Sequence, residues 1–213
     1  MSLGITARKA LRIVAPLLLV GLMAVALVPS RGSGAAPPFP ALSPDLDSVR
    51  AALSKYKDPV QAVHDGFLST LACIDFPSGA TEGSMKFAPG AMGVHFLNMG
   101  NVGPTLDPMK PQVLMYEPTK DGKLVLVAAE WFMPAQLVTG DTPPSILGQQ
   151  LQGPMDGHAP IMPPELRHYD LHVWLWKNNP AGMFSPTNPD VKCGSYAYSF
   201  QEGGPHAGNE HKH

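Results

Sequence analysis

The chain has 213 residues, of which 15 are basic, 17 are acidic and 8 are histidine. Apolar residues make up 44%, which is enough for a buried core and excludes a fibrous or wholly disordered protein. Because no basic run occurs after the first dozen residues, the composition also disfavours a nucleic-acid-binding protein.

Residues 1–36 have the pattern of a secretory signal peptide. Three basic residues (Arg8, Lys9 and Arg12) precede an uncharged apolar run over 13–28, and small residues follow. A helix over that run spans about 24 Å, less than the roughly 30 Å hydrocarbon layer of a membrane. An uncleaved N-terminal anchor is the alternative. Both interpretations place the rest of the chain outside the cytoplasm, periplasmic or secreted, with no other membrane attachment.

The only two cysteines are Cys73 and Cys193. An even number of cysteines in an exported chain predicts a disulfide, here closing a loop of about 120 residues. A metal site made by this pair has less support, because no CxxC spacing is present. Without residues 1–36 the chain keeps 11 basic and 17 acidic residues, so we expect no attraction to nucleic acid or anionic lipid.

Two helices are predicted at the start of the exported part. Ser43-Pro44 provides a helix start, and apolar residues follow at helical spacing up to Tyr56. Asp58-Pro59 repeats the start signal for a second helix that ends before Pro77 and includes Cys73. One face of this second helix would carry Val60, Val63, Phe67 and Leu71.

The later chain predicts strands over 92–98, 112–117, 123–132 and 167–177, where apolar residues alternate. The Asp121-Gly122 pair predicts a hairpin between the second and third of these. The fold class is therefore α+β, with two N-terminal helices packed on a curved antiparallel sheet in a single domain over 37–202. The Pro- and Gly-rich segment 133–165 is predicted to be an ordered flap over one end of the sheet, and 203–213 a flexible tail.

Two strands contain a polar residue where the pattern requires an apolar one. Glu130 is the only acid in the centre of its strand, so it must be paired, protonated or bound to a metal if it is buried. A solvent-facing position near the strand end is the alternative. His95 lies between Val94 and Phe96, where a hydrogen-bonded core histidine is the alternative to a ligand.

The last strand alternates between an aliphatic face and a face with His168, Asp170 and His172. The two histidines, about 13 Å apart along a strand, cannot bind one ion together, but Asp170 can orient His172. His95, Glu130 and His172 then form a possible metal site for zinc or non-haem iron. The alternative is three polar residues that are satisfied separately. Copper is a further metal reading, based on Met155, His158 and Met162.

Four stretches, MGVHFLNMG (92–100), KPQVLMYEP (110–118), AAEWF (128–132) and YDLHVWLWKNNPAGMFSPTNPDVKC (169–193), carry a resemblance. They look like a group of exported bacterial proteins of uncharacterised function. The resemblance implies a common single-domain fold. It implies no reaction, cofactor or catalytic residue.

Two functional hypotheses follow. The first is an exported metal-binding protein with a His/Glu/His site, whose catalytic role the sequence leaves open and which would take a small-molecule ligand. The second is a metal-free binding module, in which the flap and a surface formed by Trp131, Trp174 and Trp176 hold an apolar or aromatic ligand or a partner protein. No GxSxG elbow or glycine-rich phosphate loop supports nucleophilic or phosphoryl chemistry.

Overall fold

The structure is a computed structural model that describes residues 44–82, 85–158, 162–194, 196 and 199–201. The predicted signal peptide and the predicted tail lie outside the described residues. In the part of the chain that is described, no helix is long and apolar enough to cross a membrane.

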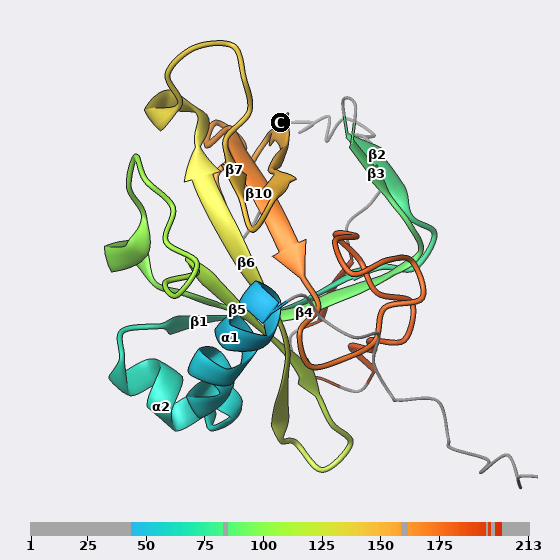
Figure 1. Cartoon of the computed structure of the whole chain (residues 1–213). Coiled ribbons are helices and arrows are strands. Elements are labelled where there is room, and N and C mark those ends of the chain that lie inside the picture. The colour runs from blue at the N-terminus through green and yellow to red at the C-terminus, as the bar shows by residue number, and fades with distance from the viewer. Residues whose placement is uncertain (1–43, 83–84, 159–161, 195, 197–198, 202–213) are drawn as a thin grey trace, which may run out of the picture. The chain divides into compact units, whose positions relative to one another are not determined.

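A curled seven-stranded sheet organises the fold, in the strand order β11-β1-β4-β5-β6-β10-β9 (Figure 1). Neighbouring strands are antiparallel except β1 and β11, which are parallel. In chain order the strands are β1 (Leu68–Phe76), β4 (Gly90–Leu97), β5 (Val113–Pro118), β6 (Leu124–Pro134), β9 (Gln152–Met155), β10 (His168–Val173) and β11 (Ser199–Gln201). The predicted α+β class and the four predicted strands are confirmed, each within a few residues of its expected ends.

The predicted hairpin joins β5 and β6. The Thr119 amide donates to the Lys123 carbonyl at 2.8 Å, and the Gly122 amide donates to the Thr119 carbonyl at 3.0 Å. Gly122 has a φ of +78°, which a glycine adopts without steric cost. The turn fixes the register of the residues near it, and a register shift between Met115 and Tyr116 then brings Glu130 opposite Val113.

The first predicted helix is present as α1 (Pro44–Leu53), which continues into the 3-10 turn η1 (Ser54–Lys57). This segment packs on the sheet through its buried apolar residues. Two hydrogen bonds hold it there: the Tyr116 hydroxyl donates to the Tyr56 carbonyl at 2.7 Å, and the Trp176 indole donates to the Ser54 hydroxyl at 3.2 Å.

The prediction of a long second helix is wrong. The Asp58 side chain caps a helix as expected, but α2 (Pro59–His64) has only six residues. Gly66, at a φ of +95°, follows the helix in the left-handed conformation that commonly terminates helices, and β1 begins at Leu68. The four residues of the predicted apolar face do not share one environment, since Val60, Val63 and Leu71 are exposed and Phe67 is buried.

Cys73 consequently lies on a strand and not on a helix. It forms the predicted disulfide with Cys193, which follows the turns after β10. Cys73 also pairs with Val94 of β4 and Ser199 of β11 in the sheet. The bridge therefore ties the late chain to the second strand from one edge of the sheet.

The segment 133–165 contains more regular structure than a flap. Met133 and Pro134 complete β6, η3 (Ala135–Leu137) follows, and β7 (Ser145–Ile146) pairs with β8 (Gln149–Gln150). Strand β9 then adds to the main sheet beside β10, with His168 opposite Met155. Residues 159–161 are outside the described part, and the covering role of the segment stays a prediction.

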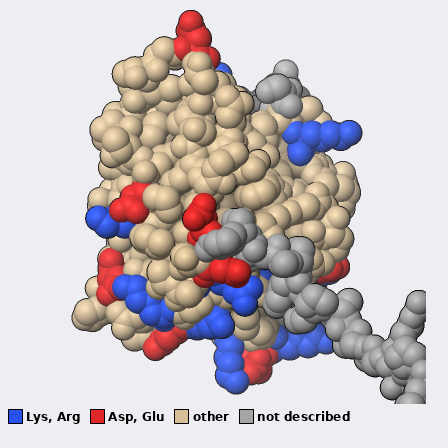
Figure 2. Space-filling view, in the orientation of Figure 1, with Lys and Arg blue, Asp and Glu red and all other residues tan. Residues whose placement is uncertain are grey.

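Two small elements complete the description: η2 (Met99–Asn101) after β4, and a hairpin of β2 (Ala80–Glu82) with β3 (Met85–Phe87). On the face shown in Figure 2, charged residues of both signs are interspersed, mainly over the part where Figure 1 shows α1 and α2. A second group of ionisable residues is buried in the sheet, and it forms the candidate site.

Candidate metal centre

Three strands bring the predicted ligands together on one face of the sheet. His95 lies on β4, Glu130 on β6 and His172 on β10. Glu130 and His172 are direct partners in the register of β6 and β10. On its other side Glu130 pairs with Val113 of β5, and Val113 pairs with Leu97. His95 lies two residues before Leu97, so strand alternation places it on the same face.

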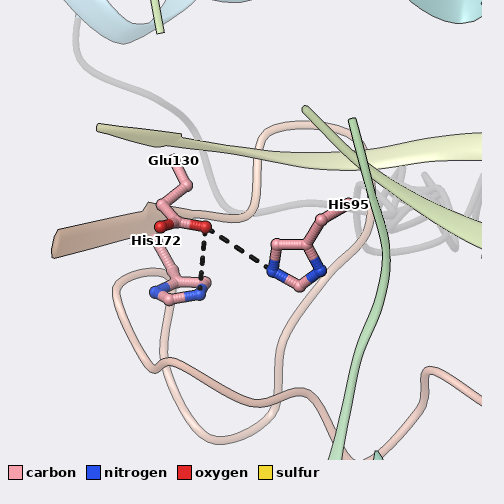
Figure 3. A group of neighbouring side chains, drawn as sticks. All are labelled: His95, Glu130 and His172. Carbon is pink, nitrogen blue, oxygen red and sulfur yellow. Dashed lines mark ion pairs between the residues drawn. The ribbon is translucent and has the colours of Figure 1, made fainter. Parts of the chain in front are cut away.

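The Glu130 carboxylate lies between the two imidazoles (Figure 3). Its Oε2 atom is 3.6 Å from His95 Nε2 and 3.6 Å from His172 Nε2. One ligand atom from each residue lies within 4.8 Å of the others. Ligand bonds of about 2.1 Å at tetrahedral angles place donor atoms about 3.4 Å apart, so the spacing fits a single ion. A direct hydrogen bond would bring the atoms closer, to about 2.9 Å.

The Nδ1 atom of each imidazole faces an oxygen, but within the described part of the chain only that of His95 makes a hydrogen bond. His95 Nδ1 lies 3.2 Å from the carbonyl oxygen of Gly93, which makes Nδ1 the donor and leaves the Nε2 lone pair directed at Glu130. His172 Nδ1 faces Asp170 Oδ1 at 3.6 Å. Metal-ligating histidines usually present their second nitrogen to a carbonyl or a carboxylate in this way. The orienting role of Asp170 stays a prediction, because 3.6 Å is longer than a hydrogen bond.

Gly93 is required at its position for steric reasons. Its φ is +94°, and a Cβ atom there would lie 2.5 Å from the Tyr116 carbonyl oxygen on β5. Only glycine accommodates both the conformation and the close approach of the two strands. The same residue supplies the carbonyl that holds His95, so the sequence of β4 provides a ligand and its support two residues apart.

Burial governs the charges of the group, because His95, Glu130 and His172 are respectively 8%, 4% and 1% exposed. Burial, aided by the neighbouring His172 and His158, lowers the pKa of His95 to about 3, so this ring is neutral. Burial also raises the pKa of Glu130. Burial opposes charge on His172, but the Asp170 and Glu130 carboxylates outweigh it and raise the pKa of that imidazole.

Asp170 completes a row of buried ionisable groups. Its Oδ2 lies 3.7 Å from His168 Nε2, so one carboxylate faces two imidazoles. Although burial works against ionisation, His172 and His168 hold the pKa of Asp170 well below its usual range. Three atoms of the row, Asp170 Oδ1 and both ring nitrogens of His172, are buried without a hydrogen-bond partner among the described residues. An ion bound between His172 Nε2 and Glu130 would explain the first of these nitrogens, and it would not account for Nδ1 or for Asp170 Oδ1.

A cavity of about 40 Å³ adjoins the three ligands. His168 and Asp170 line it together with residues from several other segments: Thr70, Ile74, Met92, Leu97, Val113, His158 and Met162. Thr70 and Ile74 were not predicted there, because the residues before Pro77 were assigned to a helix and not to a strand of the sheet. Thr70 supports the site directly, since its hydroxyl donates to the His95 carbonyl at 3.2 Å.

Of the residues considered for copper, His158 and Met162 line this cavity, whereas Met155 is buried on β9. The His158 ring packs edge-on against Phe87 and His168, with centroids 6.0 and 5.8 Å away. The copper reading and the His/Glu/His reading therefore concern one location and not two.

The predicted tryptophan surface is absent from the described fold. Trp131 and Trp174 are 0% and 2% exposed, and their indole nitrogens donate to the carbonyls of Asp107 and Ser185. Trp176 alone is partly exposed, and it lines a surface cleft of about 380 Å³ with Arg50 and Lys57. The three indoles thus belong mainly to the core.

Comparisons with protein-family models, with curated proteins and with solved structures find no match to this chain. The site is therefore interpreted from its own geometry.

Proposed function

We propose that this protein is an exported metal-binding protein in which His95, Glu130 and His172 hold one zinc or non-haem iron ion. The observation that carries the proposal is the orientation of the two imidazoles. Each has its Nδ1 atom directed at an acceptor, and each has its Nε2 atom 3.6 Å from the same carboxylate oxygen. This is the arrangement of ligands around an ion and of the groups that support them.

Three protein ligands leave at least one coordination position open. A zinc or iron ion held in this way activates water or binds a small molecule at that position. The neutral state of His95 favours coordination, since a ligating imidazole must be unprotonated. Asp170 stabilises His172 in the tautomer with a proton on Nδ1. Soft neighbours, Met92 and Met162, line the same cavity and make copper the alternative ion.

The disulfide between Cys73 and Cys193 supports the exported location, because such bonds persist in oxidising compartments. The residues of the site, all within the sheet, would then meet whatever metal ions that compartment supplies.

Elemental analysis of the purified chain tests the proposal. We expect about one equivalent of zinc, iron or copper per chain, lost in His172→Ala. His64→Ala is the matched control, because the His64 side chain is 80% exposed on α2 and should not affect the metal content. If the chain is metal-free and none of these ions raises its unfolding temperature, the proposal is wrong.

A further inference from the structure

The cavity at the candidate metal centre restricts what can bind there, and this inference rests on the proposed function. Its volume is about 40 Å³. One water molecule needs about 10–15 Å³ of such space, whereas sites for organic ligands usually measure about 300–1,000 Å³. Beside an ion, the space admits only one or two very small molecules.

The walls that Ile74 and Val113 form belong to paired strands, whereas His158 and Met162 line the cavity from outside the strands. Ile74 and Val113 line it and are 1% and 3% exposed. Ile74 pairs with Gly93 of β4, and Val113 pairs with Leu97 on one side and Glu130 on the other. Since a strand that is hydrogen-bonded on both sides cannot shift without breaking its ladders, these walls do not retreat to admit a larger ligand.

Polar groups in the wall are already engaged with the protein. The Thr70 hydroxyl donates to the His95 carbonyl, and His168 Nδ1 lies 3.1 Å from the Leu166 carbonyl oxygen. Asp170 faces two imidazoles. An organic substrate needs several polar partners for orientation, and the Thr70 hydroxyl and His168 Nδ1 are already occupied. Ile74, Leu97 and Val113 present only apolar surface.

We propose that the open coordination position takes a molecule of two or three heavy atoms, such as dioxygen, azide or nitric oxide, and excludes organic substrates and bidentate chelators. The ligand class follows from the volume, from the aliphatic side chains beside Glu130 and from the occupied polar groups. The metal ion supplies the attraction, and the cavity supplies the size limit.

Cobalt substitution tests this proposal, because the visible spectrum of Co²⁺ reports its coordination. The full chain is loaded with Co²⁺ and titrated with azide and, separately, with acetohydroxamate, a larger bidentate ligand. We expect azide to change the spectrum saturably and to bind at least about tenfold more tightly than acetohydroxamate.

A variant that enlarges the cavity sharpens the test. Val113→Ala removes two methyl groups from the wall beside Glu130, and we expect it to improve acetohydroxamate binding about tenfold relative to azide. Val173→Ala is the matched control, since Val173 is also buried and, directly after His172 on β10, lies on the opposite face of the sheet, so it should leave the ratio unchanged.

The outcomes separate this inference from the proposed function. If Co²⁺ does not bind, the proposed function is wrong and this inference with it. If Co²⁺ binds but azide leaves the spectrum unchanged, or acetohydroxamate binds the unmodified chain as well as azide does, the metal site stands and the small-ligand inference is overturned. These titrations use the unmodified chain, so they test the inference even if Val113→Ala does not fold.

Discussion

Replacing Glu130 by glutamine should have opposite effects on the stability of the fold with and without metal. The change keeps the shape of the side chain and removes its charge. Burial raises the pKa of Glu130 above its ordinary value of 4.5. A raised carboxyl pKa stabilises the fold at low pH, and this contribution is lost as the pH rises through the folded-state value. At neutral pH the metal-free Glu130→Gln chain should therefore be at least as stable as the unmodified chain.

The stabilisation of the fold by bound metal gives the size of the expected effect. At a free metal concentration of about 100 times Kd, binding stabilises the fold by about 2.7 kcal/mol. For a chain of about this size, each kcal/mol raises the unfolding temperature by about 2–4 °C, so the expected increase is about 5–11 °C. Glu130→Gln should lose most of this increase, because a neutral amide is a poor ligand for a divalent ion.

Thermal unfolding after dialysis against a chelator, and again after addition of Zn²⁺, measures both effects. Glu117→Gln is a suitable control, since Glu117 is on the neighbouring strand β5 but pairs with Lys177 at 2.6 Å, away from the site. This control should keep the full metal-dependent increase. Two results would refute the reasoning: retention of the increase by Glu130→Gln, or a metal-free variant that unfolds several degrees below the unmodified chain.

Three further predictions concern the surroundings of the site. Asp170→Asn should weaken metal binding about 10- to 100-fold, measured by competition with a chromogenic chelator, because His172 loses the carboxylate that orients it; unchanged affinity would contradict the orienting role. Because the pKa of His95 falls from 6.5 to about 3 on folding, the unfolded chain binds this proton first as the pH drops. The free energy of unfolding of the metal-free protein should therefore fall by about 2 kcal/mol between about pH 6.5 and 5 through this residue. In His95→Gln, urea denaturation should not show this fall. Cys73→Ser should cost about 5 kcal/mol in urea denaturation, since the bridge to Cys193 closes a loop of 120 residues; a variant of unchanged stability would show that the disulfide does not stabilise the fold.

The site was predictable because its residues interrupt a regular pattern. In β6 and β10 the alternation of apolar side chains assigns each residue to a face, and Glu130 and His172 are conspicuous on theirs. The Asp121-Gly122 turn supports the register of one neighbouring pair. Whether three strands bring their polar residues to one point depends on strand order, which local patterns do not contain.

The segment from Val60 to Phe76 shows why the remaining features were not predictable. Its apolar residues have helical spacing, but Gly66 ends the helix after a short segment, and sheet pairing with β4 and β11 determines the rest. Tertiary contacts therefore decide between two local structures that the sequence permits. Because Thr70 and Ile74 were assigned to a helix, their position in the wall of the cavity was not predicted.

The distribution of the three ligands along the chain has a consequence for how an ion is acquired. No two of them are neighbours in sequence, and β5 must lie between β4 and β6 before His95 can approach the others. An unfolded chain consequently offers no preformed chelate, and capture of the proposed ion would have to follow assembly of the sheet. The identity of such an ion would then be set by what is available where folding finishes, and not by what the chain encounters during its synthesis.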